Sequence, residues 1–251
     1  MLVNTSTLPA IKAPVIFLPG TLCDERIFIP LWQQMNLDHR SYVPLQWADT
    51  LENMLALTAD RLNSFSEKVH LVAYSMGAYV AALAALDGKF THNIASLSFI
   101  GYNPYGLSEQ ETRSRMQMLK AIKQKKFTGL NSAKLQQYFT QSEIDQSNNN
   151  SPLVQTVLDM ESDLGASALH GHISSTTPRK DLANKLAKLS IAQCWFSARH
   201  DVIAPATKIE QFCNTAKQAK HHDFTDTAHM MPLTRPNELA QLLTQHILAH
   251  S

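Results

Sequence analysis

The stretch around Ser75 has the residue types and spacing of a nucleophile held on a sharp turn. An apolar run at 69–73 leads into Ala-Tyr-Ser-Met-Gly at 73–77, and an alanine-rich stretch follows directly. A serine on a strained strand-to-helix turn needs small residues two positions before and after it, and here these are Ala73 and Gly77. Its hydroxyl would project above the sheet, beside a helix N-terminus that favours negative charge. The alternative is that Ser75 only caps that helix.

His229 is the candidate for the general base. It follows the last predicted strand, and a loop at that point can carry an imidazole over the carboxyl ends of the strands to the serine. The chain has 11 histidines, so position must decide between them. Position argues against five others: His70 at the start of its strand, His221 and His222 before or at the start of a strand, and His170 and His172 in a helical segment.

Asp201 is the candidate for the acid that orients the base. It lies where an apolar strand ends, in a turn before a helix that opens with Pro205. It could instead cap that helix, and Asp226 is a rival acid because it precedes His229 by only three residues. The order Ser75, Asp201, His229, each after a strand of its own, is that of α/β hydrolases and differs from that of other triad enzymes. The sequence therefore predicts a catalytic triad.

Gly20 marks a predicted oxyanion hole. It comes soon after the first clear strand candidate, Val15 to Leu18. A glycine there lets the backbone turn so that an amide N–H points at the reacting carbonyl. Together with the N–H of Met76, the residue after the nucleophile, that amide would hold the negative charge of a tetrahedral intermediate. The alternative is an ordinary strand-to-helix turn with Asp24 as N-cap, and both interpretations can hold at once.

Strand-like and helix-like segments alternate in the two outer parts of the chain, which is typical of βαβ units on a parallel sheet. Apolar runs, as expected of strands covered on both faces, predict strands at 15–18, 69–73, 97–100, 191–196 and 222–225, with a further one at 41–45. Helical patterns lie between them at 24–35, 51–65, 76–86, 205–216 and 236–249. Right-handed crossovers would place these helices on both sides of the sheet.

The alternation stops between Pro104 and Leu189, where only helical patterns occur. They cover 108–127, 132–139, 152–169 and 179–186. The polar tract Gln-Ser-Asn-Asn-Asn-Ser at 146–151 indicates an exposed loop. We therefore predict a core made of 1–103 and 189–251, with an all-helical cap or lid inserted at 104–188.

The chain resembles the α/β-hydrolase superfamily along nearly its whole length, most closely a small bacterial branch of pimeloyl-carrier-protein methyl ester esterases and related carboxylesterases. The resemblance rests on Leu-Pro-Gly-Thr at 18–21, the pentapeptide at 73–77, Asp201 followed by Pro205, and His-Met-Met-Pro at 229–232. It implies the α/β-hydrolase fold, a mostly parallel sheet with helices on both faces. The family often has His-Gly in the first loop, and here Pro19 replaces the histidine. The first oxyanion amide should therefore be that of Thr21, with Met76 as the second donor.

These motifs do not identify the substrate, because relatives with the same triad cleave esters, lactones, thioesters or carbon–carbon bonds. We expect a serine hydrolase that cleaves a small carboxylic ester, such as an acyl methyl ester or a thioester, through an acyl-enzyme. The alternatives are carbon–carbon hydrolysis, lactone hydrolysis or acyl transfer on the same triad, or a non-catalytic binding protein that uses the same pocket. The mechanism requires no metal or organic cofactor. The candidate substrate contacts are Leu22, Tyr74 and Asn103.

The inserted segment should supply walls for the substrate. Some of its apolar residues could line an acyl pocket, although most are expected to pack the cap onto the core: Met116, Met118, Leu119, Ile122, Phe127 and Tyr138. Its basic residues could dock an acidic carrier protein, although at about 100° per residue they spiral around the helix as on a solvated face: Arg113, Arg115, Lys120, Lys123, Lys125 and Lys126.

Composition narrows the class of protein. Of the 251 residues, 44% are hydrophobic and 17% charged, and the formal net charge is +1, so no long-range field attracts nucleic acid or an anionic membrane. The N-terminus lacks the pattern of a secretory signal, and no run approaches the roughly 18 apolar residues of a membrane span. Cys23, Cys194 and Cys213 fit neither a disulfide framework nor a zinc site. We expect a cytoplasmic monomer or weak homodimer that acts on a small molecule.

Overall fold

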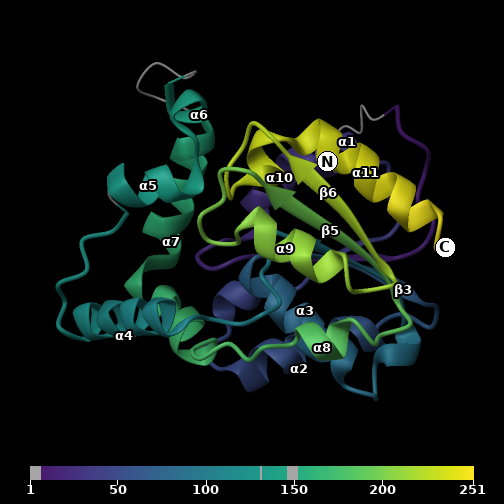
Figure 1. Cartoon of the computed structure of the whole chain (residues 1–251), viewed down its shortest axis with the longest axis horizontal. Coiled ribbons are helices and arrows are strands. Elements are labelled where there is room, and N and C mark those ends of the chain that lie inside the picture. Colours follow the sequence, from purple (N-terminus) through teal and green to yellow (C-terminus); the bar gives the residue numbers. More distant parts are fainter. Residues whose placement is uncertain (1–6, 131, 146–151) are drawn as a thin grey trace.

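One parallel β-sheet forms the centre of the molecule. The computed structural model describes residues 7–130, 132–145 and 152–251 (Figure 1). Its six strands pair in parallel, in the order β2-β1-β3-β4-β5-β6. The predicted α/β class is confirmed. The strands are β1 (Val15–Leu18), β2 (Arg40–Tyr42), β3 (Val69–Tyr74), β4 (Ile94–Ile100), β5 (Ala192–Ala198) and β6 (Ala219–Phe224).

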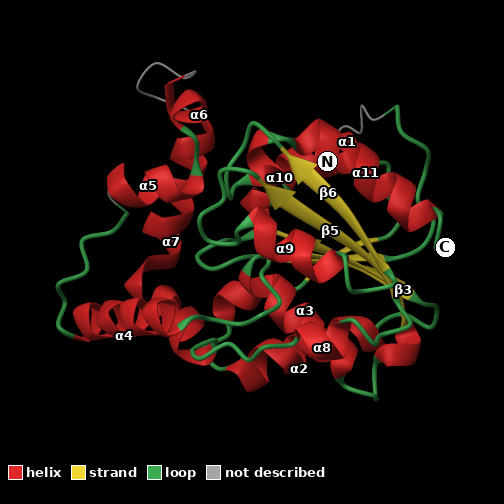
Figure 2. Cartoon of the chain, viewed as in Figure 1, coloured by secondary structure: helices red, strands yellow, loops and turns green. Residues whose placement is uncertain are grey.

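Helices cover both faces of this sheet (Figure 2). Along β1, Ile16 and Leu18 pack into the core cluster with α2, α3, α8 and α9, whereas Val15 and Phe17 pack with α1, α10 and α11 on the other face. Alternate side chains therefore enter two different cores, which explains why the strand is apolar throughout. These helices are α1 (Ile29–Gln34), α2 (Leu51–Asn63), α3 (Met76–Leu86), α8 (Ala183–Leu186), α9 (Ala206–Cys213), α10 (Met231–Thr234) and α11 (Pro236–Leu248).

The predicted helix at 24–35 is interrupted. It consists of a 3-10 turn, Glu25–Ile27, followed by α1. Pro30 stands in the first turn of α1, and because proline has no amide hydrogen it cannot continue the hydrogen bonding of a helix that began before it. The predicted strand at 41–45 is also shorter, since β2 ends at Tyr42 and a second 3-10 turn covers Leu45–Trp47.

The last strand begins earlier than predicted. β6 starts at Ala219, three residues before the predicted start, so His221 and His222 lie inside the strand and not before it or at its start. Because β6 is an edge strand, one side of it is open to solvent and tolerates polar residues such as Lys220. A strand of this composition lacks the apolar run by which the other strands were predicted.

Between β4 and β5 the described residues form helices and no strand. α4 to α7 stand beside the sheet core, at the left of Figure 1, whereas α8 packs against α3. α7 extends beyond its predicted end at 169 and is broken at Gly165, whose φ of 70° and ψ of −178° are not helical. The predicted loop at 146–151 lies outside the described residues. The inserted helices are α4 (Glu109–Lys123), α5 (Ser132–Tyr138), α6 (Gln141–Asp145) and α7 (Pro152–Ser175).

A side chain at position 77 has no room. A Cβ placed on Gly77 would lie 2.5 Å from the carbonyl oxygens of Leu18 and Pro19, which belong to the backbone and cannot rotate away. We expect Gly77→Ala to lower the free energy of unfolding by about 3 kcal/mol, because α3 must move off β1. Urea unfolding measures this change, with Gly88→Ala as the control because no atom lies within 4 Å of a Cβ there. Equal unfolding free energies for the Gly77→Ala variant and the unmodified protein would contradict the close contact.

Candidate active site

Ser75 occupies the turn between β3 and α3. Its φ of 51° and ψ of −109° are strained values for a residue with a side chain. They arise because the chain reverses from strand to helix within one residue, with the Ser75 N–H still bonded to the carbonyl of Ile100 (2.9 Å). The side chain makes no capping hydrogen bond to α3. The capping alternative is therefore not what the structure shows.

The structure brings the three predicted triad residues together. The Ser75 hydroxyl lies 3.0 Å from His229 Nε2, and His229 Nδ1 lies 2.7 Å from Asp201 Oδ2. The three residues are 8%, 3% and 4% exposed respectively, so water competes little for these hydrogen bonds. Asp226, the rival acid, is exposed and makes no such contact, although its backbone carbonyl accepts a hydrogen bond from Arg235.

Asp201 also closes its own turn. Its Oδ1 accepts hydrogen bonds from the amides of Ile203 (2.8 Å) and Ala204 (2.9 Å), just before α9 begins. The two oxygens thus have different partners, one fixing the carboxylate and the other facing the imidazole. The base-orienting interpretation describes a contact of this side chain. The helix-capping alternative does not, because the N-cap of α9 is Pro205 without a side-chain capping hydrogen bond, and Asp201 binds the turn before it.

Aromatic rings and a glycine hold the imidazole of His229 in place. The ring centroid of Tyr74 lies 5.2 Å from that of His229 and that of Tyr138 lies 6.3 Å away. The Tyr74 hydroxyl donates to the His229 carbonyl (3.3 Å) and contacts Met230 Sδ (3.1 Å). A Cβ at Gly101, where φ is +59°, would lie 3.1 Å from His229 Cε1. Gly101 leaves room for the imidazole of His229, a role that was not predicted from the sequence.

The loop after β1 lies directly against the nucleophile. A Cβ at Gly20 would lie 2.9 Å from the Tyr74 ring and 3.3 Å from Ser75 Cβ, so only glycine fits this approach. Thr21 lines the same cavity as Ser75. Among the described residues, neither the Thr21 N–H nor the Met76 N–H, at the first position of α3, donates to a protein acceptor. Both amides are thus available to a ligand.

His172 holds this loop from the side of α7. The Leu22 N–H donates to His172 Nδ1 (3.1 Å), and His172 Nε2–H donates to the Leu45 carbonyl (3.1 Å). Leu22 has a φ of 52°, which a residue with a side chain adopts only when its surroundings enforce it. Burial lowers the pKa of His172 from 6.5 to about 4, so the ring is neutral at pH 7. The folded protein holds this ring neutral, so the stability that the buried His172 contributes is fully present above pH 6.5. That stability is lost as the pH falls towards 4 and the ring takes up a proton.

We expect His172 to act on turnover through the Leu22 amide. His172→Gln keeps a donor for the Leu45 carbonyl but removes the acceptor for Leu22, and should lower kcat by roughly tenfold or more through misplacement of the loop. His172→Asn keeps an acceptor near the position of Nδ1 and should lower kcat less. Steady-state kinetics on p-nitrophenyl acetate compares the two, with urea unfolding to show that both variants are folded. Equal kcat values would contradict a role for the Leu22 contact.

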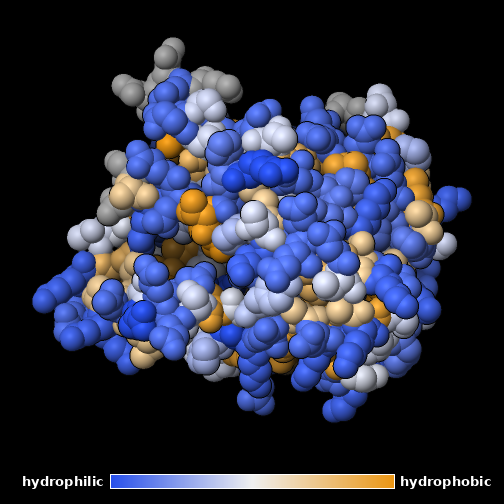
Figure 3. All heavy atoms as spheres, viewed as in Figure 1, coloured by the Kyte–Doolittle hydropathy of each residue, from blue (hydrophilic) through white to orange (hydrophobic). Residues whose placement is uncertain are grey.

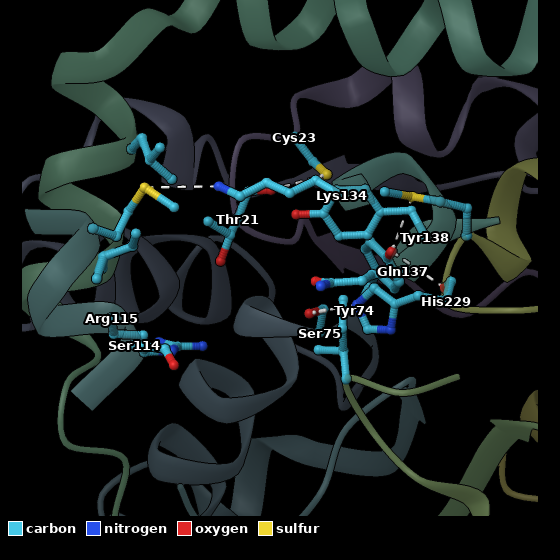
Figure 4. A pocket seen from close by; sticks show the side chains of 15 residues that line it. Thr21, Cys23, Tyr74, Ser75, Ser114, Arg115, Lys134, Gln137, Tyr138 and His229 are labelled. Atoms are coloured by element: carbon cyan, nitrogen blue, oxygen red, sulfur yellow. Dashed lines mark hydrogen bonds between the residues drawn. The ribbon is translucent and has the colours of Figure 1, made fainter. Parts of the chain in front are cut away.

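A cavity of about 340 Å³ opens at Ser75 (Figure 4). In Figure 3, apolar residues gather around a hollow between the inserted helices and the rest of the molecule. Burial raises the pKa of the Cys23 thiol in the cavity wall to about 12, so this cysteine is protonated and unreactive at neutral pH. The lining residues are Thr21, Cys23, Tyr74, Ser75, Ser114, Arg115, Met118, Lys134, Gln137, Tyr138, Leu169, Ile173, Ile203, His229 and Met230.

Only one of the three predicted substrate contacts lines the cavity at Ser75. Tyr74 lines the cavity, while Leu22 borders a smaller adjacent cavity together with Phe127. Asn103 lines neither cavity, and its Oδ1 accepts a hydrogen bond from the Tyr105 amide. Met118 and Tyr138, predicted from the inserted segment, line the main cavity. Of the others, Met116 is exposed, and Leu119, Ile122 and Phe127 pack around Leu22, Leu169 and Ile173.

Within residues 7–130, 132–145 and 152–251, no group of three or more histidine, cysteine, aspartate or glutamate side chains is arranged to hold a metal ion. Over the same residues, no helix has the length and apolar character needed to cross a membrane.

Comparison with solved structures identifies the fold of this chain. No protein-family model matches the sequence, and no curated protein matches it either. Among solved structures, a thermophilic esterase from Thermogutta terrifontis with bound malate has a TM-score of 0.80 at 16% identity, over 100% of this chain and 98% of its own. The chain has the α/β-hydrolase fold. In this α/β-hydrolase sheet, Ser75, Asp201 and His229 follow the carboxyl ends of β3, β5 and β6.

Two further structures support the same fold. The esterase EaEST from Exiguobacterium antarcticum has a TM-score of 0.75 at 15% identity, over 96% of this chain and 93% of its own. MenH from S. aureus has a TM-score of 0.73 at 14% identity, over 98% of this chain and 96% of its own. The α/β-hydrolase fold carries many reactions, so the function must be argued from the site.

Proposed function

We propose that the protein is a serine hydrolase that cleaves small carboxylic esters. The observation that carries the proposal is the chain of hydrogen bonds from the Ser75 hydroxyl through the His229 imidazole to the Asp201 carboxylate. In this mechanism His229 Nε2 takes the hydroxyl proton as Ser75 Oγ attacks the acyl carbon, and Asp201 stabilises the resulting imidazolium. The amides of Thr21 and Met76 are the proposed donors to the oxyanion.

The reaction then releases two products. His229 gives its proton to the leaving alcohol, which departs and leaves an acyl group on Ser75. A water molecule loses a proton to the same nitrogen, attacks the acyl carbon and frees the acid. His229 returns this proton to Ser75 Oγ as the bond between Oγ and the acyl carbon breaks, and no oxidation state changes in either step.

Cavity size and the inserted helices support a small substrate. The cavity volume of about 340 Å³ lies at the lower end of the range of small-molecule pockets, about 300–1,000 Å³. We propose that segment 104–188 acts as a cap, since α4, α5 and α7 supply part of the cavity wall. Two of the similar structures are esterases, which supports an ester as substrate. An acyl methyl ester, as in the branch that the sequence resembles, is the proposed form.

A series of p-nitrophenyl esters from acetate to decanoate tests the proposal. We expect kcat/KM to be highest for short acyl chains and to fall once the chain outgrows the cavity. Monomethyl pimelate, followed by methanol release, tests the methyl ester directly. The absence of turnover on every ester, by protein whose folding is verified by circular dichroism, would contradict ester hydrolysis and favour a binding role for the pocket.

A further inference from the structure

The charged side chains that line the cavity at Ser75 are both positive. Two cationic residues contribute to its wall, Arg115 from α4 and Lys134 from α5. Among the described residues, no aspartate or glutamate lines this cavity. A partly dehydrated cavity strengthens the field of such charges and favours a ligand of opposite sign. The lining therefore points to an anionic group on the substrate.

Arg115 is held in an inward position. It is half-buried, whereas Arg113 on the same helix has a side chain that is 67% exposed and pairs with Glu109. Arg115 Nη1 donates to the carbonyl (3.4 Å) and the hydroxyl (3.3 Å) of Thr176, beyond the end of α7. In Figure 4 the side chain enters the open space opposite Ser75 and His229. It belongs to the cavity and not to the solvated face that the sequence pattern predicted.

Among the described residues Arg115 forms no ion pair, and the carboxylate that acts on its charge, Glu111 on the same helix, does so without direct contact. Thr176 supplies only neutral acceptors for one of its nitrogens. Burial lowers the pKa of Arg115. A second guanidinium, Arg179, adds like charge nearby: burial and the charge of Arg115 lower its pKa to about 9. A carboxylate in the cavity would compensate this charge, and the planar guanidinium suits its geometry.

We propose that the substrate is an ester that also carries a carboxylate, and that Arg115 binds this carboxylate while Ser75 attacks the ester group. The proposal rests on the proposed hydrolase function and specifies its substrate class. Lys134 lines the same cavity, and Glu161, which borders the adjacent smaller cavity, offsets part of its charge, so Arg115 is the principal candidate for binding an anion. The carboxylate can lie on the acid part or on the alcohol part of the ester, and matched pairs of esters separate these two cases.

Matched pairs of esters test the charge requirement. Monomethyl adipate and methyl hexanoate share a six-carbon acid and differ in the terminal carboxylate. The anion of 4-acetoxybutanoic acid and butyl acetate make the same comparison on the alcohol side. In at least one pair we expect kcat/KM of the anionic ester to exceed that of the neutral ester by about tenfold or more. The pair that shows the preference identifies the part of the ester that bears the carboxylate.

Substitutions assign the preference to Arg115. Arg115→Gln keeps a donor for Thr176 but removes the charge, and should abolish the preference by lowering kcat/KM of the anionic ester far more than that of the neutral ester. Arg115→Lys should retain part of the preference, because the charge remains. Arg113→Ala, on the exposed face of α4, is the matched control and should leave both rates unchanged. Equal preference in the unmodified protein and in Arg115→Gln would overturn the proposal.

Calorimetric binding of adipate gives a readout that needs no turnover. The unmodified protein should bind adipate at least about tenfold more tightly than Arg115→Gln does. Binding that depends on Arg115, in a protein that hydrolyses no ester, would support the anion site and contradict the hydrolase proposal. Hydrolysis of neutral esters, with no anionic preference and no Arg115-dependent binding, would overturn the anion site and leave the hydrolase proposal in place.

Discussion

Ser75→Ala should lower kcat for ester hydrolysis by about 10⁴-fold or more, the largest effect that we expect of a single substitution. The variant lacks the hydroxyl that lies 3.0 Å from His229 Nε2, so no acyl-enzyme can form. Residual activity above the rate in water would come from binding and from the oxyanion donors, which the substitution leaves in place. Initial rates on the best p-nitrophenyl ester measure the loss.

A second buried serine–histidine pair provides the matched control. Ser96 is fully buried and its hydroxyl lies 2.8 Å from His70 Nδ1. Both residues lie in the first halves of their strands, at the opposite end of the sheet from the candidate site. Ser96→Ala should lower stability by about 1 kcal/mol and leave kcat within about twofold. Unchanged turnover in Ser75→Ala, with a loss in Ser96→Ala, would contradict the assignment of the nucleophile.

Asp201→Asn should lower kcat by about 10³- to 10⁴-fold without unfolding the protein. Asparagine can still accept from the amides of Ile203 and Ala204 through one oxygen, so the turn should persist. Its amide group would face His229 Nδ1 and donate to it, which places the ring proton on Nε2. That nitrogen could then no longer accept the proton of the Ser75 hydroxyl.

Asp226→Asn separates the two candidate acids. Asp226 is exposed, and the carboxylate that contacts His229 is that of Asp201, so this variant should keep kcat within about twofold. Steady-state rates for both variants on one ester, with urea unfolding to compare their stabilities, make the test. A larger loss in Asp226→Asn than in Asp201→Asn would show that the wrong carboxylate was assigned.

The catalytic candidates could be predicted because each has a local signature. Ser75 lies between an apolar run and an alanine-rich helix, and Asp201 and His229 each follow a strand. The carboxyl ends of parallel strands share one edge of a sheet, so residues that follow them meet even when far apart in sequence. The structure brings together the side chains that this rule selected.

The supporting residues have no such signature. His172 acts on Leu22, which lies 150 positions earlier in the chain, and a histidine within a helical pattern gives no sign of such a partner. Gly101 matters because of its φ of +59° and its closeness to the imidazole. Arg113 and Arg115 lie in the same predicted helix, and nothing in their sequence surroundings distinguishes them. Arg115 faces the cavity because α4 packs against α7 and Arg115 donates to Thr176, whereas Arg113 pairs with Glu109 on the exposed face.

Covalent labelling measures directly whether Ser75 is the nucleophile. The protein is treated with a fluorophosphonate, and the site and stoichiometry of the adduct are measured by intact-mass and peptide mass spectrometry. We expect one adduct per chain, on Ser75, formed at a rate that His229→Ala lowers strongly, with hydrolytic activity lost in proportion to labelling. Ester turnover that continues after Ser75 is fully labelled, or an adduct that inactivates the protein from another residue, would contradict that role of Ser75.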